Sequence, residues 1–150
     1  MIRRALIADA EQIQRLINRF ADEERLLPRS LSEVYDNLRD FYVYEGQDRH
    51  IGGVCALHIC WEDLAEIRSL AVVKGERKKG IGGKLIEACL LEARQLGVKQ
   101  VFLLTYIPPY FERTGFQVTD KSTLPHKIWA DCIRCVKFPD CDETAMILDL

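Results

Sequence analysis

The chain has 150 residues and a mass of 17.3 kDa, which is the size of one ordinary domain with a substantial core. Its 21 Lys and Arg against 23 Asp and Glu leave a net charge of −2, which argues against a protein that binds nucleic acid or an anionic membrane surface. A hydrophobic fraction of 48% excludes an intrinsically disordered chain.

The sequence also carries no apolar segment of the kind that crosses a membrane. Its longest apolar run, Ile51–Trp61, is broken by glycines and a histidine. The first residues, Met1–Arg4, lead directly into alternating sequence without an apolar signal segment. We therefore expect a cytoplasmic protein.

The first half of the chain predicts one strand, two helices and three more strands. Asp9 is expected to cap the first helix, and Ser30 with Glu33 forms a capping-box pattern that starts the second. Apolar residues recur at helical spacing in both, at Ile13, Leu16, Ile17 and Phe20 and then at Val34 and Leu38. β-rich segments predict strands at Ile2–Ile7, Phe41–Tyr44, Ile51–Cys60 and Leu64–Val73, with a hairpin turn at Gly46–Arg49.

The second half predicts a long amphipathic helix followed by strands. Residues 82–96 place apolar side chains on one helical face, and Gly97 ends that helix. Pro108 and Pro109 open a short helical turn, which Gly115 closes. Strands are expected at Val101–Leu104, Phe116–Thr119 and Met146–Leu148. This order indicates an α+β (α/β) fold with a mixed sheet and, without repeats or linkers, a single domain over residues 1–150.

A glycine-rich basic loop stands between a predicted strand and the long helix. Its residues are Arg77, Lys78, Lys79, Gly80, Ile81, Gly82, Gly83 and Lys84. Glycines let the backbone N–H groups approach a ligand, and a helix N-terminus attracts negative charge. The loop therefore predicts a site for a phosphate or pyrophosphate, although it lacks the first glycine of a dinucleotide fingerprint and the ending of a P-loop.

Three linked segments resemble the GNAT family of N-acetyltransferases. Glu66–Val72 followed by Arg77-x-x-Gly80-x-Gly82 is similar to the acetyl-coenzyme A motif of that family, and Tyr110–Phe116 resembles its aromatic-x-x-x-Gly-Phe ending. The resemblance implies a GNAT fold, with a mostly antiparallel mixed sheet flanked by helices, and acetyl-CoA as cosubstrate. It implies no metal.

Two shorter segments resemble the acetyltransferase domain of bacterial N-acetylglutamate synthases. They are Leu27–Ser30 and Ala65–Val72. This resemblance implies a small amino-acid substrate, L-glutamate, in the first step of arginine biosynthesis. A dicarboxylate needs arginines, so we nominate Arg29 and Arg68 as substrate-binding residues. No amino-acid-kinase domain precedes this one, so we expect no feedback control through such a domain.

The resemblance also implies roles for the strand before the loop. The main chain of Leu70, Ala71 and Val72 would hold the pantetheine arm, with the Leu70 N–H as donor to the thioester oxygen. Glu66 lies where several members carry a glutamate that acts as the general base. The alternative for Glu66 is an ion pair with Arg68, and for the strand it is ordinary core packing.

The position of the general acid departs from the family pattern. Many members have a tyrosine four residues before the final Gly-Phe, and this chain has Phe111 there. Tyr106 and Tyr110 are the available substitutes, although packing aromatics explain both equally well. Transfer without a dedicated acid is also possible because a thiolate is a good leaving group.

Three of the six cysteines, Cys132, Cys135 and Cys141, crowd the C-terminal region. With His126 they have part of a zinc-site pattern, but a structural zinc site usually has two close pairs, so free thiols are the preferred interpretation. Cys89 lies on the apolar helix face and is not expected to be a nucleophile.

The function predicted from these observations is direct acetyl transfer to an amino acid in a ternary complex. The alternatives are another small amine or a protein N-terminus as acceptor, or a CoA-binding module without catalysis. A homodimer is compatible with the predicted fold.

Overall fold

The computed structural model describes residues 1–22, 28–124 and 143–150. Its strands are β1 Ile2–Arg4, β2 Phe41–Glu45, β3 Ile51–Trp61, β4 Leu64–Val72, β5 Gln100–Thr105, β6 Gln117–Thr119 and β7 Thr144–Asp149. Its α-helices are α1 Ala10–Asp22, α2 Leu31–Asp36, α3 Ile81–Leu96 and α4 Pro108–Glu112. The element types and their order agree with the sequence prediction.

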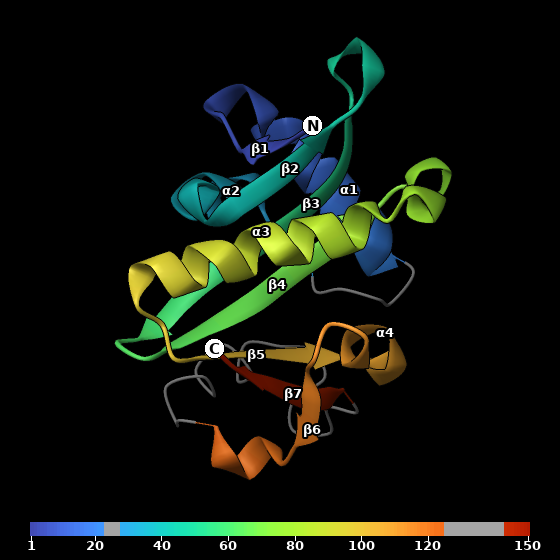
Figure 1. Ribbon diagram of the computed structural model, residues 1–150. Coiled ribbons are helices and arrows are strands. Elements are labelled where there is room, and N and C mark those ends of the chain that lie inside the picture. The colour runs from blue at the N-terminus through green and yellow to red at the C-terminus, as the bar shows by residue number, and fades with distance from the viewer. Residues whose placement is uncertain (23–27, 125–142) are drawn as a thin grey trace.

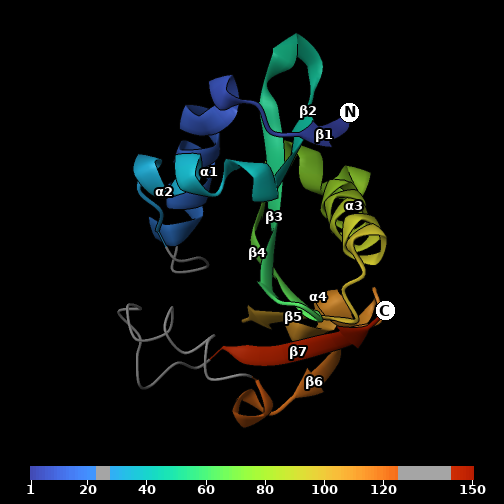
Figure 2. The ribbon, with the colours of Figure 1, turned by 90° about the vertical axis from the view of Figure 1, so that its left-hand side faces the viewer.

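The strands form one seven-stranded mixed sheet in the order β1-β2-β3-β4-β5-β7-β6. Only β4 and β5 are parallel among the described pairs, because α3 carries the chain from one to the other. Helices α1 and α2 cover one face of the β2–β4 region and α3 covers the other, while β7 runs across the direction of β3 (Figure 2). This is the α+β arrangement that the sequence predicts, a mixed and mostly antiparallel sheet flanked by helices.

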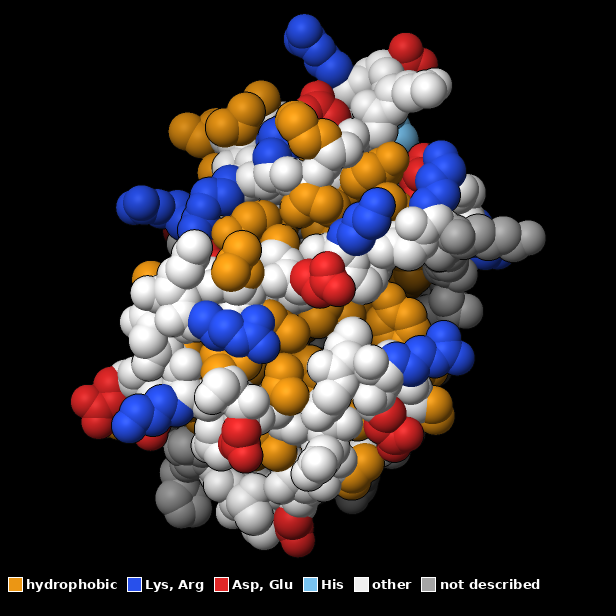
Figure 3. All heavy atoms as spheres, viewed as in Figure 1, with side chains coloured by type: hydrophobic (Ala, Val, Ile, Leu, Met, Phe, Trp, Pro, Cys, Tyr) orange, Lys and Arg blue, Asp and Glu red, His pale blue; other side chains and the backbone are white. Residues whose placement is uncertain are grey.

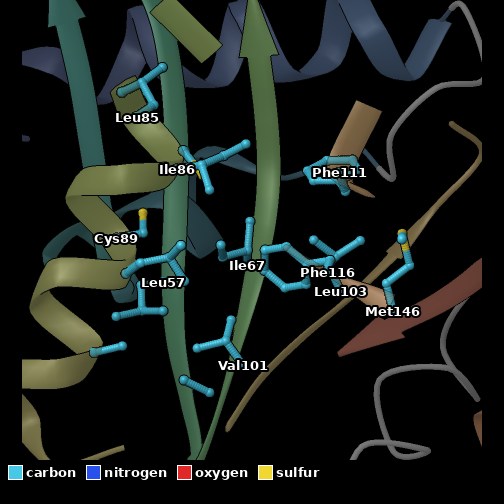
Figure 4. Packing of buried hydrophobic residues seen from close by; sticks show 14 of the residues in the cluster. Leu57, Ile67, Leu85, Ile86, Cys89, Val101, Leu103, Phe111, Phe116 and Met146 are labelled. Atoms are coloured by element: carbon cyan, nitrogen blue, oxygen red, sulfur yellow. The ribbon is translucent and has the colours of Figure 1, made fainter. Parts of the chain in front are cut away.

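Two apolar clusters hold these layers together. Under α3, Leu85, Ile86 and Cys89 point toward Leu57 of β3 and Ile67 of β4 (Figure 4). On the opposite face, α1 buries Ile13 and its neighbours against alternate residues of β2 and β3. Burial of alternate side chains to opposite faces is the pattern that strand geometry requires of a sheet covered on both sides.

The surface over α3 has no single region of one charge. Lys and Arg side chains lie dispersed among apolar and acidic ones on the face that Figure 3 shows. In the described part of the chain, no helix combines the length and the hydropathy that a bilayer crossing requires.

The N-terminal strand and the first helix differ from the prediction at Asp9. Strand β1 ends at Arg4, a 3-10 turn (Ile7–Asp9) follows, and α1 begins only at Ala10. The Asp9 carboxylate does not serve as the expected N-cap. It accepts two hydrogen bonds from the Arg3 guanidinium, at 2.7 and 3.1 Å, and one from the Leu6 N–H at 2.7 Å. The charge of Arg3 therefore outcompetes the helix for this carboxylate.

The same arginine also binds the Glu45 carboxylate of β2, with 2.9 Å between Nε and Oε2. Arg3 thus ties β1, the turn before α1 and β2 to one another. Its hydrogen bonds lower the pKa of Asp9, because they outweigh the opposing effect of burial and are helped by the Leu6 N–H.

We predict that Asp9→Asn lowers the free energy of unfolding by about 1–3 kcal/mol at pH 7, because it removes the charge of a largely buried pair. An aspartate whose pKa is lowered on folding stabilises the protein above its ordinary pKa of about 4, and that stability is lost as the pH falls through the lowered value. The deficit of the variant should therefore shrink between pH 7 and pH 3 in urea titrations.

The exposed Asp36 at the end of α2 offers a matched control. Asp36→Asn should change the unfolding free energy by less than about 0.5 kcal/mol at either pH. A deficit in Asp9→Asn that is the same at both pH values would contradict the assigned role of the ion pair.

Candidate active site

A β-bulge interrupts β4 in the middle of the sheet. Ala56 of β3 pairs with Arg68, but Val54 pairs with Ala71, so two residues of β4 lie opposite one residue of β3. The first of these, Ser69, has a φ of 55°, a left-handed conformation that is costly for a non-glycine residue. A bulge bends the strand and interrupts its hydrogen-bond ladder, which is typical of functional sites.

Strands β4 and β5 separate before the bulge is reached. Their parallel register runs only over Leu64–Glu66 against Gln100–Phe102, although β4 continues to Val72 and β5 to Thr105. Figure 1 shows the two strands diverging toward the end where α3 begins and α4 lies. The predicted thioester-binding residues, Leu70–Val72, therefore lie on the part of β4 that β5 leaves.

The glycine loop begins α3 at that same end. A 3-10 turn (Lys74–Lys79) leads to Gly80, which has a φ of 71° and precedes the first helical residue, Ile81. The first hydrogen bond across this junction runs from the Lys84 N–H to the Gly80 carbonyl at 3.2 Å. The N–H groups of residues 81–83 precede the helical ladder and point toward the helix N-terminus, as an anion site requires.

The loop is also open from outside. A Cβ atom built on Gly80 or Gly83 would have no neighbour within 4 Å. Lys84 is exposed, and the exposed Lys79 pairs with Glu76 at 3.2 Å. The side chains of Arg77 and Lys78 lie outside what the structure describes, so their part in the predicted basic cluster stays a prediction.

A second feature of the site is a shallow, open pocket on the α2 side of the bulge. Both arginines nominated from the sequence, Arg29 and Arg68, line it, together with Ser69 of the bulge. The other lining residues are Glu33, Val34, Asn37, Asp40, Phe41 and Ala56. The structure thus brings together two residues that are 39 positions apart in the chain.

The main chain of Arg29 is fixed by α1. Asn18 accepts a hydrogen bond from the Arg29 N–H at 2.9 Å and donates one to its carbonyl at 3.2 Å. The guanidinium lies 3.3 Å from Glu33, which also completes the predicted capping box with Ser30. Partial burial opposes ionisation of Glu33, but hydrogen bonds from Ser30 and Arg29 outweigh it and lower its pKa.

Arg68 is paired as well. Its Nε donates to the Glu66 carboxylate at 2.6 Å, and both side chains are largely buried, with 16% and 13% exposed. The structure therefore contains the Glu66–Arg68 ion pair. This pair was the alternative to a role for Glu66 as general base. It does not remove Glu66 from the site, because a carboxylate two residues before a pocket-lining arginine lies on the same face of β4.

Comparison with known proteins identifies the family to which this chain belongs. Residues 37–118 match the model of the acetyltransferase (GNAT) domain. An uncharacterised N-acetyltransferase of Chlorobaculum tepidum is 41% identical over 151 residues, which cover 99% of this chain and 96% of that protein. The chain belongs to the GNAT acetyltransferase family.

Two further similar proteins have names that state a class of substrate. The amino-acid acetyltransferase of Mycobacterium tuberculosis is 32% identical over 136 residues, or 89% of this chain and 78% of that protein. The N-acetylglutamate synthase of Neisseria gonorrhoeae, solved with coenzyme A and N-acetyl-glutamate, superposes with a TM-score of 0.90 at 26% identity. The superposition covers all of this chain and 35% of the synthase.

The position of Tyr110 in this GNAT acetyltransferase was not predictable from the sequence. Phe111, at the usual position of the acid, is buried in the core and packs edge to face on Phe116 with 6.2 Å between ring centroids. Its neighbour Tyr110 instead brings its hydroxyl against Gly82, in the first turn of α3. Burial, reinforced by the nearby Cys55, raises the pKa of Tyr110 against the opposing charge of Arg113.

Two of the described cysteines of this GNAT acetyltransferase lie in the core, away from the pocket. Cys55 and Cys89 are fully buried under α3, and a hydrogen bond between them, together with burial, raises the pKa of Cys55 well above its usual range. Cys132, Cys135, Cys141 and His126 lie outside the described residues. Within the described ranges, no three His, Cys, Asp or Glu side chains are arranged to hold a metal.

We predict that Gly82→Ala destabilises this GNAT acetyltransferase by about 1–3 kcal/mol, because the new methyl group would overlap the Tyr110 hydroxyl. Tyr110→Phe removes that hydroxyl, so the double variant should recover most of the loss. Thermal unfolding of the four proteins measures this coupling.

Gly83→Ala provides the control in the same helical turn, because nothing lies within 4 Å of its built Cβ. We expect it to unfold at the wild-type temperature or slightly above, since alanine favours a helix over glycine by up to about 1 kcal/mol. Equal stability of Gly82→Ala and Gly83→Ala would show that Tyr110 does not pack as described.

Proposed function

We propose that this GNAT acetyltransferase transfers the acetyl group of acetyl-CoA to the α-amine of an amino acid, most specifically L-glutamate. The observation that carries the proposal is the pocket beside the β4 bulge, where Arg29 and Arg68 meet. The similarity of this chain to the amino-acid acetyltransferase and to the N-acetylglutamate synthase supports the proposal. With glutamate as acceptor, the enzyme would serve the first step of arginine synthesis in the cytoplasm. A homodimer remains a prediction.

The donor side is formed by main-chain groups. The N–H groups at the start of α3 suit the pyrophosphate of CoA, because Gly80 turns the chain there and leaves the loop open. The strand residues Leu70, Ala71 and Val72 would hold the pantetheine arm along the part of β4 that diverges from β5. The Leu70 N–H, next to the bulge, would stabilise the thioester oxygen.

The acceptor side is formed by charged side chains. Arg29 and Arg68 offer two guanidinium groups, and glutamate has two carboxylates. Asp40 lines the same pocket and supplies the opposite charge that an ammonium group needs. Because Ser69 belongs both to the pocket wall and to the bulge, an amine bound there lies close to the strand that would present the thioester.

The chemistry is attack of the neutral amine on the thioester carbonyl in a ternary complex. The ammonium must first lose a proton, and Glu66 is the acceptor that the family resemblance indicates. The thiolate then departs. Tyr110, whose hydroxyl lies against the first turn of α3 on the donor side, carries the proton that Phe111 lacks.

The test of this function is turnover with a panel of amino acids as acceptors. We expect thiol release from acetyl-CoA with L-glutamate and much less with L-glutamine or L-alanine, which lack the second carboxylate. Arg29→Ala should raise KM for glutamate at least tenfold, because a charge-assisted hydrogen bond is worth about 1.5–3 kcal/mol.

The exposed Arg15 of α1, which is not among the pocket-lining residues, serves as the control. Arg15→Ala should keep the wild-type KM. Turnover with a different amine and none with amino acids would identify another acceptor. Binding of CoA without any turnover would identify a regulatory module.

We predict that Gly80→Ala weakens binding of CoA about tenfold or more, since alanine is strained at a φ of 71° and a shift of the loop turns its N–H groups away from the phosphates. The matched control is Gly97→Ala at the other end of α3, where φ is 88° and space is equally open. Both variants should lose about 1 kcal/mol of stability.

Isothermal titration with CoA separates the two glycines. Gly97 lies about 24 Å along the helix from Gly80, so its variant should bind CoA with the wild-type affinity. If both variants weakened binding to the same extent, the effect would be one of stability, and the loop would not be the phosphate site.

A further inference from the structure

A hydrogen-bonded acid and imidazole lie beside the acceptor pocket, outside every motif of the sequence. His58 is on β3, and its Nδ1 atom lies 2.7 Å from Oδ2 of Asp40, in the turn (Leu38–Asp40) that precedes β2. Both side chains are partly buried, with 32% of His58 and 26% of Asp40 exposed. Asp40 lines the pocket directly.

His58 also faces Glu66. The two residues are directly opposed in the antiparallel pair of β3 and β4, so their side chains lie on the same face of the sheet. Among the described residues, the charged or titratable groups that face His58 are Asp40, Glu66, the diagonal Arg68 and, on its own strand, Cys60. This is the face on which the acceptor pocket lies.

These contacts give the two carboxylates of the site different properties. Glu66 touches the Arg68 guanidinium at 2.6 Å, and such contact stabilises the ionised carboxylate and lowers its affinity for a proton. Asp40 is instead hydrogen-bonded to an imidazole, the side chain that most often accepts protons in catalysis. Glu66 is occupied by a cation, whereas His58 offers a second ring nitrogen as a proton acceptor.

We propose that Asp40 binds the ammonium group of the acceptor and that His58, held by Asp40, takes up the proton it loses. This rests on the proposed function. An N–H bond of the ammonium breaks, and its proton moves through an intervening water to Nε2 of a neutral imidazole whose Nδ1–H donates to the Asp40 carboxylate. The imidazolium releases the Nε2 proton to water. The freed electron pair on nitrogen forms the new bond to the carbonyl carbon, the C–S bond breaks, and the thiolate leaves.

In this scheme Asp40 contacts the substrate and also fixes the tautomer and orientation of His58, which takes up the proton. Glu66 keeps Arg68 in position for a substrate carboxylate. The proposal therefore gives Asp40, His58 and Glu66 separate roles, whereas the family resemblance alone assigns the proton acceptor to Glu66.

The experiment compares pH profiles of kcat for the wild type, His58→Gln, Asp40→Asn and Glu66→Gln, with the acceptor that gives turnover. The wild-type kcat should rise with pH, because the proton acceptor must itself be unprotonated before it can take the proton of the ammonium. His58→Gln should lower kcat at least tenfold and flatten that rise. Asp40→Asn should do the same and also raise KM for the amine, and the double variant should lose no more than Asp40→Asn alone.

Two exposed residues provide matched controls. His50→Gln, in the turn between β2 and β3, and Asp36→Asn, on α2, should keep the wild-type rate and profile. Thermal unfolding of each variant checks folding, and the KM effect of Asp40→Asn tests the proposal independently if His58→Gln is unstable.

The outcomes separate this proposal from the proposed function. Turnover by the wild type, with an unchanged rise in His58→Gln and its loss in Glu66→Gln, would overturn the role of the pair and make Glu66 the proton acceptor. Absence of turnover by the wild type with every amino acid would overturn the proposed function itself, and with it the need for a proton acceptor here.

Discussion

Ser69 holds a left-handed backbone conformation inside a strand that is hydrogen-bonded on both sides of it, and the geometry of the active site depends on that one irregularity. Regular pairing holds at Arg68 and again at Ala71, so the surrounding sheet enforces the strained residue between them. The same position borders the acceptor pocket and begins the segment that faces the diverging β5. The segment of β4 proposed to hold the donor and the proposed acceptor pocket therefore both border the bulge.

The charges around the acceptor are arranged as short-range pairs. Arg29 lies beside Glu33, Arg68 beside Glu66 and Asp40 beside His58. Each pair fixes a side chain before the substrate arrives, which reduces the entropy lost on binding. It also leaves the pocket close to electrically neutral, so selectivity for the proposed amino-acid acceptor would depend on the position of each charge.

The sequence predicts the fold almost completely, because the fold depends on local patterns. The apolar spacing around Leu85, the capping box at Ser30 and the glycine stop at Gly97 were each enough to place an element. The error at Asp9 has a cause outside the helix, in the strand that precedes it. A cap competes with any cation that the tertiary structure brings near, and the sequence does not show that Arg3 will be that cation.

The site was only partly predictable for the same reason. The glycine loop and Arg68 belong to contiguous motifs, and Arg29 followed from a short resemblance. Asp40 and His58 belong to no motif, and 18 positions separate them in the chain. Their contact arises from the register of β2 against β3, which a pattern of residue types does not specify. The position of Tyr110 against Gly82 likewise depends on how α4 packs on α3.

The two hydrogen bonds between Asn18 and the main chain of Arg29 have an evolutionary consequence. They attach the wall of the acceptor pocket to α1, whereas the proposed donor side consists of main-chain groups of β4 and α3. Substitutions on the α1–α2 side can therefore reshape the choice of amine while the acetyl donor site stays intact. A scaffold divided in this way can acquire new acceptors one side chain at a time, since the groups proposed to hold CoA belong to other elements of the fold.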